Sequence, residues 1–343
     1  MSSIKPLNKL DIVMSVFNQE HIIERVLFGI FRNTTTPFNL ILVFDGCTDK
    51  SEQRALSYIK KTKPKNLIST TVEKADNVYE TKANNIGFKL AKEEYMITLQ
   101  DDMIIKEMGW ERRLTYPLRK FDDVLAVTSR SAHDIRNIGA GVEDYVNMAS
   151  REKGTLPRDI FAVRDIINRG PVAFRVEYLK KLDYLNENYA PAWLDEADLS
   201  LRAWESHKWR VGSFWIDYYS PIELGKTRSS DSTMSWDVNN RKNCEQLARD
   251  HREYLQQNIK HSEDIKINES DVDYVKDRGI KMFHMNFPIR YNPRVAKAVI
   301  GKYTTKIKEG IKKTISKTDI VSEEEIKKFG IKKLIKRKLK MKK

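Results

Sequence analysis

Residues 40–51 read LILVFDGCTDKS, and this stretch decides the fold class. Five apolar residues in a row are typical of a parallel strand that is buried on both faces of a sheet. Asp45 and Gly46 then give a turn signal, and a polar segment of helical period follows at about residues 50–62. A strand, a turn and a helix in this order make one βα unit, so the stretch predicts an α/β fold.

The same pattern extends to both sides of this unit. Apolar runs at residues 11–17, 67–72 and 95–99 predict three more strands, and segments at about 20–32 and 80–92 have helical period. We therefore expect a mostly parallel sheet flanked by helices. Ligands of such sheets bind beyond the carboxyl ends of the strands, so the residues that follow each strand are the candidate site.

The second half of the chain is less regular. Residues 130–170 lack a clear period, which predicts a long functional loop or lid. Further predicted elements are a strand and helix in VAFRVEYLKKL (172–182), a helix in DEADLSLRAWESH (195–207), a strand in WRVGSFWI (209–216) and a long polar helix over 236–260. We divide the chain into an α/β domain (1–235), a C-terminal helical region (236–300) and a basic extension (301–343).

Charge and cysteine content narrow the class of protein. The 343 residues include 62 Lys and Arg against 48 Asp and Glu, and two Cys, which favours a reducing compartment and a cytoplasmic protein. Residues 301–343 carry 16 Lys and Arg against 5 Asp and Glu, so +11 of the net charge of +14 lies in this extension. The nearly neutral remainder makes nucleic acid an unlikely partner. No apolar stretch is long enough for a membrane span or a signal-peptide core.

The basic extension has features of an amphipathic helix. Ser322 and Glu325 form a capping box, and apolar residues recur at near-helical spacing among the lysines that follow. Such a helix can lie on an anionic membrane, where each basic residue contributes about 1 kcal/mol. The alternatives are a solvated tail that aids solubility and a tail that binds an acidic partner. Peripheral membrane association is thus one hypothesis for residues 301–343.

Three groups of carboxylates carry the candidate chemistry. Asp101 and Asp102 follow the strand at 95–99, and such hard oxygen ligands suit Mg²⁺ or Mn²⁺. Asp45 follows the strand at 40–44, although Asp-Gly is also an ordinary turn. Asp195 and Glu196 belong to a helix start, where acids are also favoured by the helix dipole. Crowded carboxylates have raised pKa values, which suits a general base.

Four segments in order resemble the family-two nucleotide-sugar glycosyltransferases of GT-A fold over about residues 10–220. They are VMSVFNQEHIIERVLFGIFRNT, LILVFDGCTDKS, NNIGFKLAKEEYMITLQDDM and GPVAFRVEYLKKLDYLNENYAPAWLDEADLSLRAW. The resemblance implies a GT-A (Rossmann-like) sheet. It also implies metal-assisted transfer of a sugar from a nucleoside diphosphate, with inversion, to a hydroxyl of a glycan, protein or lipid.

The resemblance also assigns roles to residues of this chain. It implies nucleotide-sugar contacts from the loop after the first strand and from the Asp-Gly turn, a metal site in the family's DxD position, and a base in its Glu-Asp pair. Asn85 and Gly87 match its Asn-x-Gly, and Gly170-Pro171 lies where the acceptor-side wall begins. The implied nucleotide-sugar-binding residues are Ser15, Phe17, Asn18, Asp45, Asn85, Asp101, Asp198 and Arg202. The implied metal ligands are Asp102 and Asp101, and the implied bases are Glu196, then Asp195.

Several positions depart from the family pattern. Phe44 and Gln100 stand where the family has carboxylates, Asn84 replaces an Arg, and no His follows the strand at 209–216. Asp217 or Tyr219 could take the place of that His, and Lys226 or Arg228 could assist the leaving diphosphate. These departures motivate an alternative, a catalytically inactive GT-A scaffold that binds through its basic tail. A nucleotidyltransferase is disfavoured because no Gly-rich phosphate loop follows the first strand.

Overall fold

The computed structural model describes residues 4–139, 142–220, 236–257 and 261–273. The chain divides into two units, residues 1–290 and 291–343, and every described residue belongs to the first. The predicted amphipathic extension at 301–343, and Lys226 and Arg228, therefore lie outside the described residues. No helix in the described part combines the length and the apolar character needed to span a bilayer.

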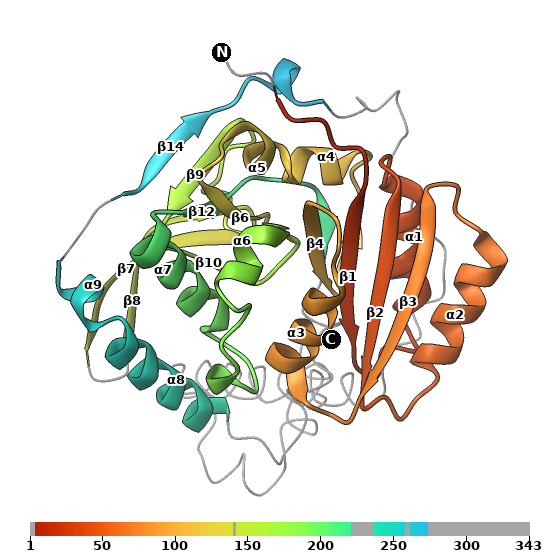
Figure 1. The fold of residues 1–343 in the computed structure, drawn as a ribbon, viewed down its shortest axis with the longest axis horizontal. Helices are drawn as coiled ribbons and strands as arrows, with labels where there is room; N and C mark the ends of the chain where they lie inside the picture. The colour runs from red at the N-terminus through yellow and green to blue at the C-terminus, as the bar shows by residue number, and fades with distance from the viewer. Residues whose placement is uncertain (1–3, 140–141, 221–235, 258–260, 274–343) are drawn as a thin grey trace, which may run out of the picture. The chain divides into compact units, whose positions relative to one another are not determined.

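One nine-stranded mixed sheet forms the centre of the fold, in the order β14-β9-β12-β6-β11-β4-β1-β2-β3 (Figure 1). β1 pairs in parallel with β2 and β4, and β2 pairs in parallel with β3, while β11 runs antiparallel between β4 and β6. Its strands are β1 (Leu10–Val16), β2 (Phe38–Asp45), β3 (Leu67–Ala75), β4 (Tyr95–Gln100), β6 (Val124–Thr128), β9 (Ile160–Arg164), β11 (Val172–Arg175), β12 (Arg210–Ser213) and β14 (Glu263–Lys266).

Smaller sheets and helices surround it. β10 (Ile166–Ile167), β7 (Ser131–Gly139) and β8 (Val142–Ser150) form a three-stranded sheet, and β5 (Ile104–Ile105) pairs with β13 (Tyr218–Tyr219). The helices are α1 (Ile23–Asn33), α2 (Ser51–Thr62), α3 (Tyr79–Leu90), α4 (Trp110–Leu114), α5 (Tyr116–Lys120), α6 (Val176–Lys181), α7 (Asp195–His207), α8 (Trp236–Asp250) and α9 (Arg252–Gln257), with 3₁₀ turns at Glu187–Tyr189 and Glu269–Asp271.

The first strands alternate between two cores, which explains their continuous apolar sequence. Ile12 and Met14 of β1 pack with α1 in one core, whereas Val13 packs with Phe88 of α3 in the other. Gly87 lets α3 approach β1 closely, because a Cβ atom there would lie 2.4 Å from Val13 Cγ1. The predicted α/β fold, with its parallel first half, is confirmed.

The prediction of a long loop over residues 130–170 is wrong. Most of this region is the β7–β8 hairpin together with β9 and β10. Its strands escape detection because polar side chains occupy buried positions: His133 and Asp134 are only 2% and 7% exposed. A half-buried strand is recognised by alternation of apolar and polar residues, and that alternation is missing here.

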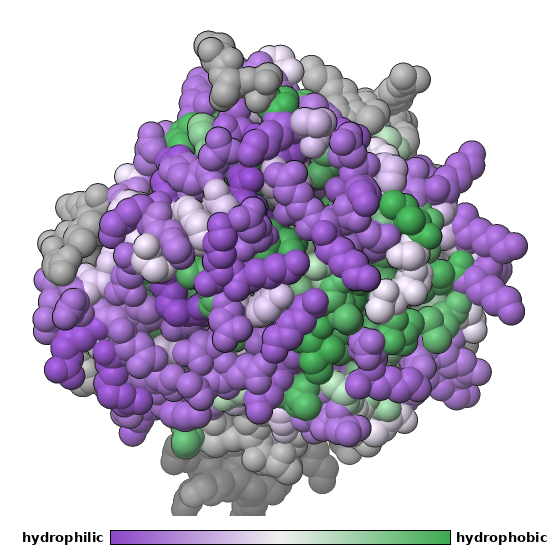
Figure 2. Space-filling view, in the orientation of Figure 1, coloured by the Kyte–Doolittle hydropathy of each residue, from purple (hydrophilic) through white to green (hydrophobic). Residues whose placement is uncertain are grey.

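The C-terminal described segment packs on the same unit. Residues 236–257 are helical, as predicted, but in two pieces, and β14 then extends the central sheet by pairing with β9. The face seen in Figure 2 is mostly hydrophilic, and its apolar side chains gather toward the half that carries β1–β3. The side that carries α7 and α8 is hydrophilic in this view.

Candidate active site

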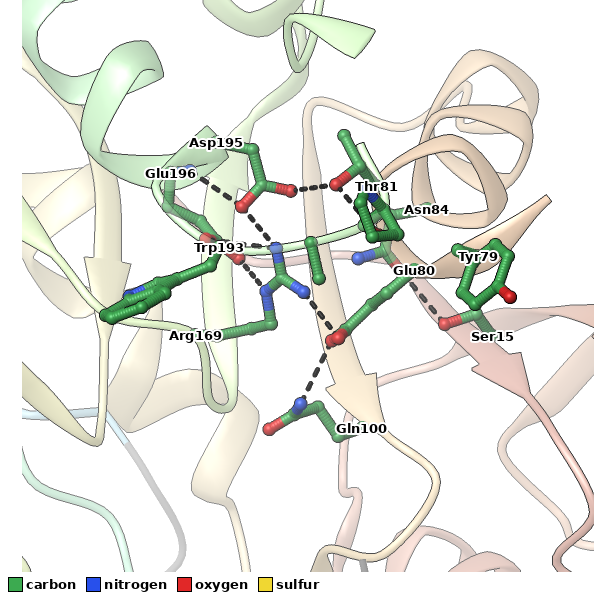
Figure 3. A network of polar contacts seen from close by, with 12 residues as sticks. Ser15, Tyr79, Glu80, Thr81, Asn84, Gln100, Arg169, Trp193, Asp195 and Glu196 are labelled. Carbon is green, nitrogen blue, oxygen red and sulfur yellow. Dashed lines mark hydrogen bonds and ion pairs between the residues drawn. The ribbon is translucent and has the colours of Figure 1, made fainter. Parts of the chain in front are cut away.

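The described residues bring the ends of three parallel strands together. Ser15 lies near the end of β1, Asp45 ends β2, and Asp101 directly follows β4. Because β1 pairs with both β2 and β4, these ends are neighbours at the carboxyl edge of the sheet. Ser15 Oγ donates a hydrogen bond to Asn84 Oδ1 on α3 at 3.0 Å (Figure 3).

Asp45 and Asn18 shape the loops of this edge. The Asp45 carboxylate is 1% exposed and accepts hydrogen bonds from the backbone amides of Val78 (2.6 Å) and Tyr79 (2.9 Å) at the start of α3. Asn18 has a left-handed backbone (φ 53°), and its Oδ1 accepts from the Thr48 amide at 2.8 Å. Both residues therefore order the backbone around the predicted nucleotide position.

Asp101 is tied to the loop that follows β1. Its Oδ2 accepts from the Phe17 amide at 2.8 Å and its Oδ1 from the Gln19 side chain at 3.0 Å. Burial and the charge of Asp102 raise the pKa of Asp101 to about 8. The loop of Phe17 is thus joined directly to the predicted metal site.

Asp102 is the better candidate for a metal ligand. Its Oδ1 is buried and accepts no hydrogen bond within the described part of the chain. Burial and the charge of Glu80 raise the pKa of Asp102 to about 6. An unpartnered buried carboxylate oxygen beside further carboxylates fits a divalent cation, which would remove the cost of burying these charges.

The protein ligands for such a metal are few. Among the described residues, no three His, Cys, Asp or Glu side chains are arranged to hold a metal ion. Asp217, a predicted substitute for the family's histidine, instead forms ion pairs with Arg151 at 2.9 Å and with Lys106 at 3.5 Å. The set that fits is Asp102 with Asp101, which matches the preference of Mg²⁺ for one or two carboxylates plus substrate phosphates.

Arg169 connects the metal side of the site to the two candidate bases (Figure 3). Its guanidinium pairs with Glu80 at 2.5 Å and forms short ion pairs with Asp195 and with Glu196. Glu80 in turn accepts a hydrogen bond from Gln100 at 3.0 Å. A chain of polar contacts therefore runs from the end of β4 to the start of α7.

The electrostatics of this cluster separate the two candidate bases. Burial and the negative charge of Asp195 raise the pKa of Glu196 well above its ordinary value. Burial also acts on Asp195, but the charge of Arg169 and a 2.7 Å hydrogen bond from Thr81 outweigh it and lower the pKa of Asp195. Burial alone would lower the pKa of Arg169, but the charges of the neighbouring carboxylates outweigh burial and raise this pKa. Of the two carboxylates, Glu196 is therefore the stronger proton acceptor.

A cavity of about 470 Å³ opens beside this cluster. Its lining includes Glu80, Gln100, Arg169, Trp193 and Glu196, together with side chains of the β7–β8 region. The residues just before α7 thus form one wall of a chamber whose lining also includes Gln100 at the end of β4 and the candidate base Glu196. Such a chamber can hold an acceptor next to a donor.

Three predicted nucleotide-sugar ligands do not join this cluster. Both amide atoms of Asn85 bond to the Leu185 backbone, at 2.8 and 3.1 Å. Asp198 is 1% exposed and pairs with Arg202 at 2.7 Å and with His251 at 3.1 Å. Arg202 also donates to backbone carbonyls between α6 and α7. These three residues hold the helices together behind the cavity.

Arg169 and Glu80 are absent from the residues predicted above. Glu80 stands at the start of a helix, where an acid is ordinary, and Arg169 lies in a stretch predicted as a loop. Their partners are 89 and 26 or more residues apart in the sequence, so only the folded chain shows the connection. The one available signal is that Arg169 directly precedes Gly170-Pro171.

Comparison with known proteins finds a family whose sequence model matches part of the chain. Residues 11–163 match the sequence model of Glycosyl transferase family 2. The chain is 26% identical over 189 residues to a chondroitin synthase of Pasteurella multocida (53% of this chain, 19% of that protein). It is 29% identical over 110 residues to an uncharacterised glycosyltransferase of Haemophilus influenzae (32% and 42%). The chain spans less than half the length of either relative.

Solved structures resemble it more distantly. The mannosyltransferase PcManGT of Pyrobaculum calidifontis, in complex with GDP-Man and Mn²⁺, gives a TM-score of 0.43 at 13% identity (61% of this chain, 57% of that chain). GalNAc-T7 with UDP, GalNAc and Mn²⁺ gives 0.48 at 13% identity (73% and 57%). Likenesses at this level carry no weight for the function.

Proposed function

We propose that the chain moves a sugar from a nucleoside diphosphate to an acceptor hydroxyl, with inversion at the anomeric carbon. The match of residues 11–163 to the model of Glycosyl transferase family 2 supports this proposal. The observation that carries this proposal is the position of Glu196. It lines the cavity, it is buried, and its pKa is raised, while a chain of polar contacts through Arg169 and Glu80 joins it to Gln100 at the end of β4, two residues before Asp102. Because the Pasteurella relative is a chondroitin synthase, a glycan is the first acceptor class to test.

Glu196 rather than Asp195 is the proposed base. Asp195 is fully buried, its pKa is lowered, and its two oxygens are bonded to Thr81 and Arg169. A group held in its ionised form by two fixed partners is suited to orienting Arg169. A carboxylate with a raised pKa accepts a proton more readily than an ordinary carboxylate, as a general base must.

The proposed reaction is one displacement. The acceptor hydroxyl oxygen attacks the anomeric carbon, its proton passes to a Glu196 carboxylate oxygen, and the bond from that carbon to the diphosphate oxygen breaks with its electron pair. A Mg²⁺ or Mn²⁺ bound by Asp102 and Asp101 would neutralise the charge of the leaving diphosphate. Arg169 holds Glu196 at the cavity wall, and no covalent intermediate is required.

A screen of nucleotide sugars for hydrolysis tests this function. Full-length protein is incubated with UDP- and GDP-linked sugars, with Mn²⁺ or Mg²⁺ and with chelator, and the released nucleotide is measured. We expect slow, metal-dependent release from at least one donor, because water can take the place of the acceptor. Release from none of them would favour the inactive scaffold.

A further inference from the structure

A single buried asparagine on α8 holds the turn that leads into the candidate base. Asn243 is fully buried, and its side-chain nitrogen lies 2.8 Å from the carbonyl oxygen of Tyr189, 3.1 Å from that of Ala192 and 2.8 Å from that of Trp193. Three carbonyl groups of one short segment thus converge on one donor group. If the amide were flipped, the Asn243 side-chain oxygen would lie against three carbonyl oxygens, and no donor would be present. The nitrogen is therefore the atom that points at the segment.

The segment held in this way is strained. Trp193 and Leu194 have φ angles of 84° and 67°, in the left-handed region that bulky residues avoid. This conformation is costly for a bulky residue and persists only where the surrounding structure fixes it. Asn243 supplies part of that fixation, and Asn239 on the same helix adds a hydrogen bond to the Ala192 carbonyl at 3.1 Å.

The strained turn leads directly into the site. Trp193 lines the cavity and is 38% exposed, and Asp195 and Glu196 are the first residues of α7. A rotation of this turn would therefore change where Glu196 meets the cavity.

α8 is itself fixed against α7. Leu201 of α7 packs in one apolar cluster with Cys244 and Leu247 of α8, and His251 pairs with Asp198 at 3.1 Å. A donor on α8 is therefore held at a defined position relative to the start of α7.

We propose that Asn243 is a positioning residue of the transfer reaction. It fixes the Trp193–Leu194 turn, and through that turn it sets the position of Glu196 at the cavity wall. Its effect on rate rests on the proposed function, whereas its effect on the turn does not. Asn243 lies outside the residues that match the family, so this assignment comes from the contacts alone.

Two near-isosteric variants of the full-length protein test the proposal. Asn243→Leu removes the donor, and Asn243→Asp replaces it with an acceptor. In metal-dependent hydrolysis of the donor found for the wild type, both should lower kcat at least about tenfold and leave the KM for the donor within about twofold. Lys242→Ala, an exposed neighbour on α8, is the matched control and should keep wild-type values. A parallel loss of kcat and donor affinity, or wild-type kcat in both variants, would overturn the proposal.

Hydrogen exchange tests the placement without any activity. In Asn243→Leu, the backbone amides of residues 189–198 should exchange at least about tenfold faster than in the wild type, while those of β1 and β4 stay protected. Unchanged exchange in 189–198 would refute the positioning role. If no donor is hydrolysed by the wild type but exchange rises as expected, the proposed function fails while the assignment of Asn243 to the turn stands.

Discussion

The Nη2 atom of Arg169 lies 3.2 Å from Oε2 of Glu196, so the candidate base is held by a cation whose side chain is only 13% exposed. The same guanidinium also pairs with Asp195 and Glu80. Three carboxylates thus share one positive charge, and an unbalanced buried charge is costly. The cluster therefore has excess negative charge. A proton transferred to Glu196 during the reaction, or a metal ion near Asp102, would reduce it.

Replacing the base should stop catalysis and spare donor binding. Glu196→Gln keeps the shape of the side chain but cannot accept the acceptor proton, so we expect donor hydrolysis and transfer to fall about 10²–10⁴-fold. The nucleotide affinity, measured by titration calorimetry, should change less than about threefold. Full activity in this variant would move the base to another residue.

Removing a proposed metal ligand should weaken donor binding only when metal is present. For Asp102→Asn we expect the donor dissociation constant with Mn²⁺ to rise at least about tenfold, because the variant loses a charged oxygen ligand. In chelator, wild type and variant should bind the nucleotide alike. Asp217→Asn is the matched control, and an equal effect there would make Asp217 a ligand instead.

Removing Arg169 should destabilise the fold in a pH-dependent way. Arg169→Met leaves Glu80, Asp195 and Glu196 without their shared cation, which should cost about 3–5 kcal/mol of unfolding free energy at pH 7.5. Carboxylates that have lost their cation bind protons more tightly in the folded state, so this cost should shrink as the pH falls toward 5.5.

Chemical denaturation at several pH values measures this effect. Arg130→Met is the control, because Arg130 and its partner Glu152 are about 40% exposed and such pairs contribute about 0–1 kcal/mol. A loss for Arg169→Met that is the same at both pH values would contradict the shared-charge account.

His251 should stabilise the protein most at and below neutral pH. Burial disfavours its charge, but hydrogen bonds to Asp198 and Glu205 outweigh burial and raise the pKa of His251 to about 9. A raised pKa adds stability that is complete below the unfolded value of about 6.5 and is lost as the pH rises through 9. The advantage of wild type over His251→Gln should therefore shrink by about 3 kcal/mol between pH 6 and pH 9.5. An advantage that grows with pH would contradict this assignment.

Residues 301–343 should bind anionic membranes if the amphipathic reading of the sequence is right. Full-length protein should sediment with phosphatidylserine-containing liposomes in low salt and be released by high salt, whereas a variant that ends at residue 300 should stay in solution. Binding that is equal in both proteins and independent of salt would remove the membrane hypothesis and favour a solvated tail.

The sequence suffices for the parts of the fold that follow simple periods. The run LILVF (40–44) predicts β2, and DEADLSLRAWESH predicts α7 at its observed bounds of Asp195–His207. The β7–β8 hairpin is not predictable in the same way. Its buried polar residues, such as Asp134 with its 2.9 Å bond to Asn147, hide the alternation that marks a strand.

Some residues of the candidate site are likewise predictable from the sequence, and others are not. Asp101, Asp102, Asp195 and Glu196 can be found because they follow a strand or open a helix. Arg169 and Asn243 cannot, because their roles depend on partners that only tertiary structure brings near. Asp198 and Arg202 lie one turn from the base in sequence, yet their side chains bond to His251 and to the loop after α6. The sequence thus predicts that α7 contributes to the site, but it does not show which side chains of α7 face the cavity.

The anomeric configuration of the first product tests the central claim most directly. Proton NMR can follow the sugar released from an α-linked nucleotide donor during the first minutes of metal-dependent hydrolysis, before mutarotation. A single displacement assisted by Glu196 predicts the β anomer as the initial product and about 10²-fold or greater loss of its formation in Glu196→Gln. Initial release of the α anomer, or undiminished release by Glu196→Gln, would contradict the account.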